Sequence, residues 1–139
     1  LYPYQSNAEG VPISVIAKTV HDFMVIARLD YGNEGVLFTG DAEAKIEYKL
    51  LSSGASLSAQ FLKVGHHGSK TSTTEKFLDA VNPEAAFIEV SAKNRYGHPH
   101  PTVLERLQSR GIKYYRTDIS GTIELLLDGN NYNINEFKQ

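Results

Sequence analysis

The sequence predicts an α/β domain in which strands and helices alternate along most of the chain. Two observations predict this class. Short runs of β-branched and aromatic residues alternate with segments whose apolar residues recur every three or four positions. The chain has 139 residues, 41% hydrophobic and 22% charged, and a net charge of −2. These values are typical of one globular domain and exclude disordered and fibrous proteins.

The first third of the sequence predicts a group of strands followed by a helix. The strands are expected at Ile13–Val20, Phe23–Leu29 and Val36–Thr39. Turn residues in the Tyr31–Gly35 segment join the second and third strands into an antiparallel hairpin. An amphipathic helix follows, because apolar residues recur at a spacing of four from Ala42 to Leu50. The Ser52–Gly54 segment ends this helix.

From residue 61 onward, the pattern alternates between strand and helix. The expected elements are a strand at Phe61–Val64, a helix at Thr73–Val81, a strand at Ala85–Val90, a helix at Thr102–Arg110 and a strand at Ile112–Tyr115. Capping-box spacing predicts that Ser72 and Thr102 cap the two helices. A terminal hairpin follows, with its strands at Thr122–Leu127 and Tyr132–Ile134.

The side chains that can perform chemistry lie in the loops that follow the strands. Strands joined through helices run parallel, so their carboxyl ends share one edge of the sheet. The loops expected at that edge are Gly40–Asp41, Gly65–Ser69, Asn94–His100 and Arg116–Gly121. The start of the antiparallel strand brings His21 to the same edge. Four of the five histidines, or all five if His100 turns inward, gather there with at least one carboxylate. This convergence predicts a ligand site.

Such a cluster of histidine and carboxylate suggests a metal. The chain has no cysteine, so imidazole and carboxylate must hold any metal ion, which suits zinc, manganese or iron. Structural roles compete with this interpretation. Asp41 can cap the following helix, and the His66–His67 pair can hydrogen-bond backbone groups. His98 can mark a turn, Ser69 can donate a hydrogen bond or begin a helix cap, and His100 more often begins a helix than binds a metal.

Four segments resemble the metallo-β-lactamase superfamily. They are Leu37–Asp41, Leu62–Ser72, Tyr96–Pro99 and Tyr115–Gly121. The His-His-Gly-Ser and Tyr-Gly-His-Pro motifs are similar to the branch found in the soluble hydrolase domain of the bacterial competence DNA-uptake channel of ComEC type. The resemblance covers about residues 23–127. It implies the C-terminal half of an αββα sandwich, with a mixed sheet and helices on one face.

The resemblance also implies roles for individual residues. Asp41 matches the aspartate that bridges two metals, and we expect it to be catalytic. The candidate metal ligands are His21, Asp41, His66 and His98. His67 is a second candidate catalytic residue, in contact with substrate or a developing oxyanion. Which of the histidines at 66, 67 and 98 binds the metal stays open. The candidate substrate-binding residues are Ser69, Lys70 and Tyr96.

One motif of the superfamily is absent from the sequence. His-x-His-x-Asp-His, the main metal motif, has no counterpart in the chain. We therefore expect residues 1–139 to be a single domain that is a fragment, with the N-terminal half of the same domain preceding Leu1. The resemblance implies a two-metal site of zinc or manganese in the intact parent, and this site is expected to be incomplete within the fragment.

For the intact parent, the resemblance implies a metal-dependent hydrolase that uses a metal-activated water. Its leading substrate is a phosphodiester, with single-stranded DNA as the leading candidate, although the near-neutral charge shows no nucleic-acid footprint. The fragment alone is expected to be inactive. The alternative is a metal-free half-domain whose apolar sheet face drives homodimer formation. No apolar run is long enough for a membrane contact by this segment, although the parent is expected to be bacterial and can be an integral membrane protein.

Overall fold

The computed structural model describes residues 14–15 and 24–138. They form a six-stranded sheet in the order β1-β2-β3-β4-β5-β6 and a separate two-stranded sheet of β7 and β8. The strands are β1 (Ser14–Val15), β2 (Ala27–Tyr31), β3 (Glu34–Phe38), β4 (Phe61–Lys63), β5 (Ala85–Ile88), β6 (Lys113–Arg116), β7 (Thr122–Leu127) and β8 (Tyr132–Phe137). Pairing is antiparallel from β1 to β3 and parallel from β3 to β6, so the predicted mixed sheet is confirmed.

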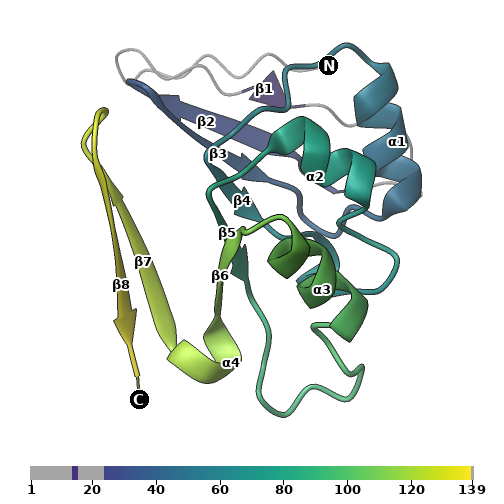
Figure 1. The fold of residues 1–139 in the computed structure, drawn as a ribbon, viewed down its shortest axis with the longest axis vertical. Coiled ribbons are helices and arrows are strands. Elements are labelled where there is room, and N and C mark those ends of the chain that lie inside the picture. Colours follow the sequence, from purple (N-terminus) through teal and green to yellow (C-terminus); the bar gives the residue numbers. More distant parts are fainter. Residues whose placement is uncertain (1–13, 16–23, 139) are drawn as a thin grey trace.

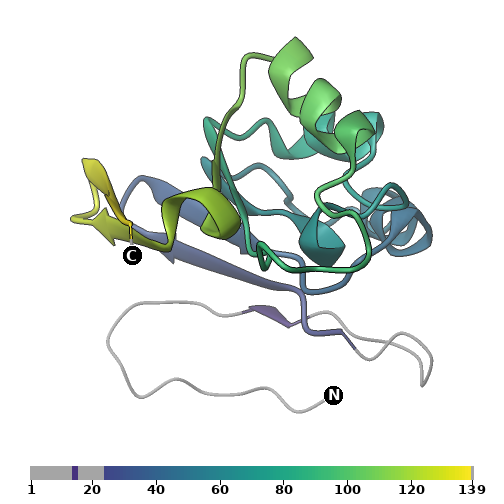
Figure 2. The same cartoon turned by 90° about the horizontal axis from the view of Figure 1, so that it is seen from below.

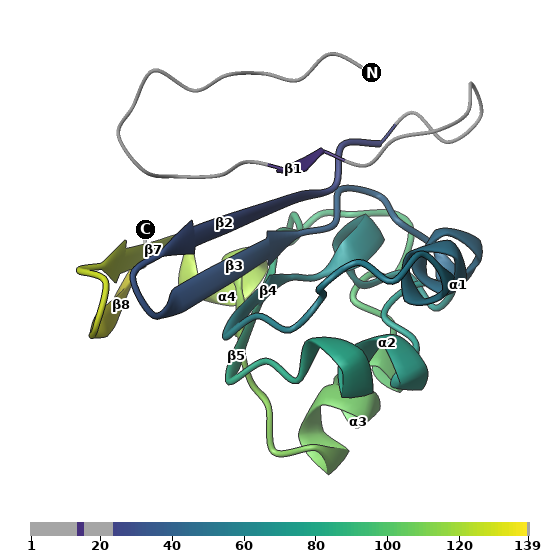
Figure 3. The same cartoon turned by 90° about the horizontal axis from the view of Figure 1, so that it is seen from above.

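Three helices lie on one face of this sheet, as the resemblance implied, namely α1 (Ala44–Ser52), α2 (Glu75–Val81) and α3 (Pro101–Ser109). The 3₁₀ turn η1 (Gly65–Gly68) follows β4, and the short α4 (Thr117–Ser120) connects β6 to β7. Figure 1 shows α1, α2 and α3 on one side of the sheet and the β7-β8 hairpin on the other. Figures 2 and 3 show the same separation from below and from above. No helix among the described residues is long and apolar enough to cross a membrane.

The core on the helix side is built from alternate strand residues and the apolar stripes of the helices. The register aligns Leu37 with Leu62 and Leu62 with Ala86, and all three point to the helices. The helices contribute further buried residues, namely Ile46, Leu50, Phe77, Leu78, Val81, Val103 and Leu107. The central strands are apolar on both faces because both faces are covered. The sheet is therefore a rigid platform for the loops at its carboxyl edge.

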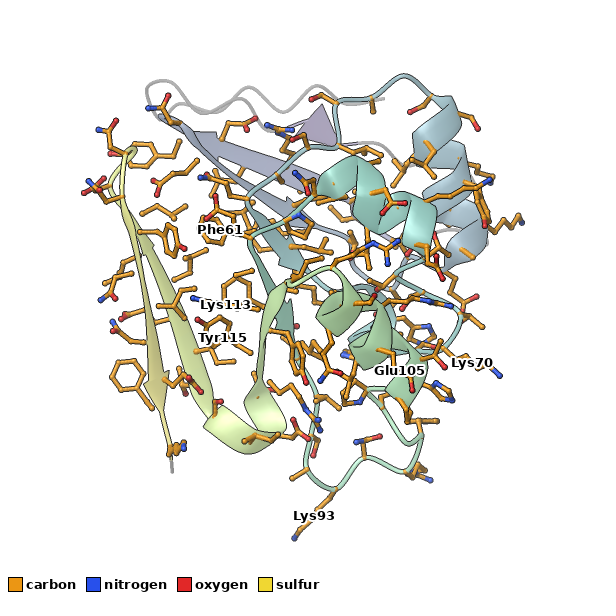
Figure 4. All side chains as sticks on the ribbon, in the orientation of Figure 1. Phe61, Lys70, Lys93, Glu105, Lys113 and Tyr115 are labelled. Atoms are coloured by element: carbon orange, nitrogen blue, oxygen red, sulfur yellow. The ribbon has the colours of Figure 1, made fainter. Side chains whose placement is uncertain are left out.

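The opposite face of the sheet is covered in part by the chain itself. Phe61 is fully buried there, and its ring meets the Tyr132 ring edge-on at 4.8 Å. Tyr115 stacks on Phe87 at 5.7 Å. Figure 4 shows Phe61 and Tyr115 on the side of the sheet that faces the hairpin. A cavity of about 280 Å³ remains between sheet and hairpin. The expectation of an apolar face is confirmed, but this chain's own hairpin lies over it.

Several local predictions differ from the structure. The second strand begins at Ala27 rather than at residue 23 and continues to Tyr31. The last strand continues to Phe137, and α4 was not predicted. Of the strand expected over residues 13–20, only Ser14–Val15 is described as a strand, and residues 16–20 lie outside the described part of the chain.

The predicted caps were wrong for both helices. Ser72 does not cap α2, because its hydroxyl lies 2.8 Å from the carbonyl oxygen of Gly65 instead. His100, rather than Thr102, caps α3: its Nδ1 accepts a hydrogen bond from the Thr102 amide at 3.2 Å. This confirms His100 as a helix-start residue. Asp41 is not a cap either, since α1 begins after Glu43, whose side chain makes no cap bond.

Candidate active site

The loops that follow β3, β4 and β5 bring Asp41 together with three histidines. Nε2 of His67 lies 3.7 Å from Oδ1 of Asp41. The ring centroid of His66 is 6.3 Å from that of His67 and 5.8 Å from that of His98. The convergence predicted from the strand ends is thus observed for these four residues. His100 turns away to cap α3. His21 lies outside the described residues.

The backbone ties these loops to one another. The His66 amide donates to Gly40 O at 3.0 Å, and the His100 amide donates to Gly68 O at 2.8 Å. Gly68 has a φ of +80°, and a Cβ there would lie 2.7 Å from Cβ of Pro99. Only glycine therefore lets the two histidine-bearing loops approach this closely. The site is a rigid junction of three loops.

His67 presents one nitrogen to Asp41 because its other nitrogen is occupied. Nδ1 lies 2.7 Å from the carbonyl oxygen of Glu89. A carbonyl can only accept, so Nδ1 carries the hydrogen and Nε2 of the neutral ring keeps a lone pair. That lone pair faces the Asp41 carboxylate across 3.7 Å. Two ligands of a tetrahedral zinc ion lie about 3.4 Å apart, so this pair of donors fits a shared cation.

The His66 ring is also held through its Nδ1, in this case by a carboxylate. Its Nδ1 lies 3.1 Å from Oε1 of Glu43, which also accepts the Thr71 hydroxyl at 2.8 Å. Ser69 Oγ lies 3.0 Å from Thr71 Oγ1 and joins the same network. A histidine whose second nitrogen donates to a carboxylate or carbonyl is the usual arrangement around a protein-bound metal. The sequence interpretation missed Glu43, although it stands only two residues after Asp41.

Both loop histidines have an unusual backbone. The φ angles of His66 and His67 are +47° and +53°, in the left-handed region that non-glycine residues rarely adopt. Such angles persist only where the surrounding contacts enforce them, and they concentrate at functional sites. They turn two successive imidazoles toward the same edge of the sheet.

His98 completes the cluster from the loop after β5. Burial, followed by repulsion from His66 and His67, lowers the pKa of its ring below the usual value, so the neutral form dominates at pH 7. Its Nδ1 is buried and has no hydrogen-bond partner among the described residues. Asn94 holds the loop, because its Oδ1 accepts the His98 amide and its Nδ2 donates to the His98 carbonyl, each at 2.9 Å. The uncharged imidazole of His98 is therefore an electron-pair donor on a loop that Asn94 holds in place.

The candidate substrate residues lie around this cluster in different environments. Tyr96 is 75% exposed, and its ring stacks on His98 with centroids 5.9 Å apart. Lys70 is exposed, and Figure 4 shows its side chain at the outer edge of the molecule. Ser69 is only 7% exposed, and its hydroxyl faces Thr71 rather than solvent. The roles of all three in substrate binding stay predictions.

Comparison with known proteins identifies the fold family. Residues 12–88 match the family described as the metallo-beta-lactamase superfamily. The chain belongs to this superfamily. Metallo-β-lactamase proteins generally bind metal ions, usually zinc. In this metallo-β-lactamase chain, however, the described residues contain no group of three or more histidine, aspartate or glutamate side chains that could hold a metal ion.

Three relatives place the chain within the metallo-β-lactamase superfamily. It is 42% identical over 96 residues to ComE operon protein 3 of Bacillus subtilis, covering 69% of this chain and 12% of that protein. It is 41% identical over 100 residues to competence protein ComA of Neisseria gonorrhoeae, covering 71% of this chain and 14% of that protein. It is 36% identical over 114 residues to recombination protein 2 of Haemophilus influenzae, covering 82% and 14%. The expected ComEC-type branch is confirmed.

Proposed function

We propose that this chain contributes one side of a metal-dependent phosphodiesterase site. The observation that carries the proposal is the pair formed by Asp41 and His67. Oδ1 of Asp41 and Nε2 of His67 are 3.7 Å apart, and the Glu89 carbonyl holds the other ring nitrogen, so that Nε2 is the nitrogen on the side of Asp41. Both side chains remain accessible, with 46% of the His67 side chain and 60% of the Asp41 side chain exposed. The pair is therefore open to a metal and to a substrate.

The residues present fit a metal site that is partly assembled. Asp41 and His67 would hold one zinc or manganese ion between them, and His66 and His98 are the further candidate ligands. When bound, the metal supplies a Lewis acid and a water whose pKa is lowered. Glu43 and the Glu89 carbonyl orient the rings of His66 and His67. In this proposal, the Asp41 carboxylate would be a ligand of the site, as its match to the superfamily's aspartate implies.

Further ligands in this proposal are His21, which lies outside the described residues, and side chains of a polypeptide outside this chain. The chain spans 12% to 14% of the length of the three relatives described above. We infer that residues 1–139 form the C-terminal half of a larger domain and that the N-terminal half of that domain supplies the missing ligands. The chain alone is then inactive.

Single-stranded DNA is the proposed substrate. Of the relatives, one is named a competence protein, one a ComE operon protein and one a recombination protein. Tyr96 offers an exposed aromatic ring beside the histidine cluster, and such rings stack on unpaired bases. Lys70 supplies a positive charge for a phosphate, and the Ser69 hydroxyl holds the segment after His67 through Thr71.

Metal analysis tests this proposal. A polypeptide that contains both halves of the domain is purified without chelator or affinity histidines, and its zinc and manganese contents are measured together with hydrolysis of single-stranded DNA. Asp41→Ala is expected to lose metal and activity. Asp79→Ala, which removes an exposed carboxylate from α2, keeps both. Unchanged metal content and hydrolysis in Asp41→Ala would contradict the proposal.

A second candidate function rests on the incompletely covered sheet face. The cavity between sheet and hairpin is lined mostly by apolar residues, including Val36, Phe87 and Leu125. In this alternative, the chain acts without metal as a structural module that forms a homodimer through this face. Sizing chromatography distinguishes the two proposals, because a chain that stays monomeric at about 100 micromolar does not self-associate with the micromolar affinity that a stable dimer needs.

A further inference from the structure

The loop that carries the site histidines needs support from outside the site. This segment, Gly65–Thr74, is called the histidine loop below. It contains left-handed backbone at His66, His67 and Thr73, with φ angles of +47°, +53° and +55°. Backbone bonds to neighbouring loops hold its first half, such as that from the His66 amide to Gly40. Its second half ends at a strained residue, so other contacts must hold it there.

Glu47 supplies the first of these contacts. It projects from α1 and is only 1% exposed. One carboxylate oxygen accepts the Thr73 amide, and the other accepts the Thr74 amide at 2.8 Å. Burial raises the pKa of Glu47, while these two amides and the charge of Arg106 act in the opposite direction. Glu47 on one helix thus accepts the amide of Thr74, the N-cap residue of another, as the glutamate of a capping box does.

Arg106 supplies the opposing contact from α3. Its Nη1 donates to the carbonyl oxygens of Ser72 and Thr73, at 3.0 Å and 3.2 Å. The peptide groups that end the histidine loop are therefore held between an anion that accepts their N–H groups and a cation that donates to their carbonyls. Each of these hydrogen bonds has one charged partner, and such bonds are stronger than hydrogen bonds between neutral groups.

Ser72 connects this end of the histidine loop to the residues on either side of the two histidines. Its side chain is fully buried, and its hydroxyl oxygen lies 2.8 Å from Gly65 O and 2.9 Å from Ser69 O. The hydroxyl closes the two ends of the histidine loop on each other. Fixing the loop at Ser72 through Arg106 therefore also fixes Gly65, the residue before His66.

We infer that Glu47 and Arg106 are positioning residues that hold the histidine loop in the conformation from which His66 and His67 present their Nε2 atoms. Among the described residues, neither forms a hydrogen bond or ion pair with Asp41 or with the site histidines. They act only through the loop backbone. The inference rests on the proposed function for the purpose of the loop. The conformation of the loop does not depend on that function.

The ring nitrogens of the two histidines provide the test. Long-range proton–nitrogen NMR spectra of the chain, recorded without metal, report which nitrogen of each imidazole carries the hydrogen. The wild type is expected to show protonated Nδ1 at His66 and His67. Glu47→Gln keeps the side-chain shape but offers only one acceptor to the two amides, and we expect the Nδ1-protonated pattern to be lost. Glu105→Gln makes the same chemical change on the exposed surface of α3 and should leave the pattern intact.

The outcomes separate positioning from simple stabilisation. Loss of the pattern in Glu47→Gln, with core methyl signals unchanged, supports the inference. Wild-type ring signals in a Glu47→Gln variant with a lowered melting temperature would overturn it, because Glu47 would then contribute only to stability. If Glu47→Gln does not fold, Arg106→Lys decides by the same signals. Because the spectra need neither metal nor DNA, a failure of the proposed phosphodiesterase function leaves this result readable.

Discussion

Oδ1 of Asp41 faces Nε2 of His67 across 3.7 Å, and the second nitrogen of that imidazole is bound to the Glu89 carbonyl. Two electron-pair donors point at each other at the carboxyl edge of a parallel sheet, where α/β folds place their ligands. A metal ion bound between the two atoms would remove the repulsion between their lone pairs. The predictions below separate the contributions of the residues around this pair.

Glu43 is expected to control the metal affinity of the cluster through His66. Glu43→Gln replaces the carboxylate that accepts His66 Nδ1 and the Thr71 hydroxyl. Loss of such an outer partner lowers metal affinity by roughly 10- to 100-fold. Calorimetric titration with zinc, in a polypeptide containing both halves of the domain, measures the change. Glu75→Gln, at an exposed helix position, serves as the control, and equal affinities in the two variants would exclude this role.

Tyr96 is expected to bind a nucleobase by stacking. The ring is 75% exposed and is supported from one side by His98. Base stacking on an aromatic ring contributes about 1–3 kcal/mol, so Tyr96→Ala should weaken binding of single-stranded DNA by roughly 5- to 150-fold. Tyr96→Phe should bind as the wild type does. Fluorescence anisotropy with a labelled oligonucleotide measures both, and equal losses in the two variants would argue for the hydroxyl instead.

His98 is expected to make stability depend on pH. Its folded-state pKa lies below the usual 6.5, first because of burial and then because of the neighbouring histidines. The unfolded chain takes up this proton near pH 6.5, whereas the folded chain takes it up only at lower pH. The stabilising contribution is therefore complete above about pH 6.5 and is lost as the pH falls toward the folded pKa.

Urea unfolding of the metal-free chain at about pH 7.5 and about pH 5.5 measures this effect. The wild type should lose stability at the lower pH, and His98→Asn should lose less. Removing His98 also removes its repulsion with the neighbouring histidines, so the difference between the two proteins reports His98 together with this repulsion. An identical loss in the two proteins would assign the pH dependence to groups other than His98.

Phe61 is expected to hold the terminal hairpin against the sheet. It is fully buried and contacts the Tyr132 ring. Phe61→Ala should lower the free energy of unfolding by about 3–5 kcal/mol, because the site cannot collapse around the lost ring. Phe137→Ala, at a position that is 53% exposed, should change it by less than about 1 kcal/mol. Denaturant unfolding compares the two, and similar losses would show that the hairpin does not depend on Phe61.

The order of strands and helices was accessible from the sequence because it rests on local periodicity. Short runs of β-branched, aromatic and other apolar residues marked β3, β4 and β5, and the spacing of apolar residues from Ala42 to Leu50 marked α1. The convergence of Asp41, His67 and His98 followed from the rule that parallel strands end at one edge. The caps were predicted wrongly because Ser72 and Thr102 have the correct spacing, but the Ser72 hydroxyl bonds Gly65 O, and α3 has as its cap His100, two residues before Thr102.

The sequence by itself determined the fold class, the edge of the sheet that carries the site and the residue types available for a metal. Only the tertiary structure decided which nitrogen of His67 faces Asp41, and that Glu43, Glu47 and Arg106 support the loop. The physical reason is the separation along the chain between the groups that interact. Strand and helix formation depends on neighbours in sequence, whereas ring orientation depends on single hydrogen bonds between groups more than twenty residues apart, such as Nδ1 of His67 and the carbonyl of Glu89.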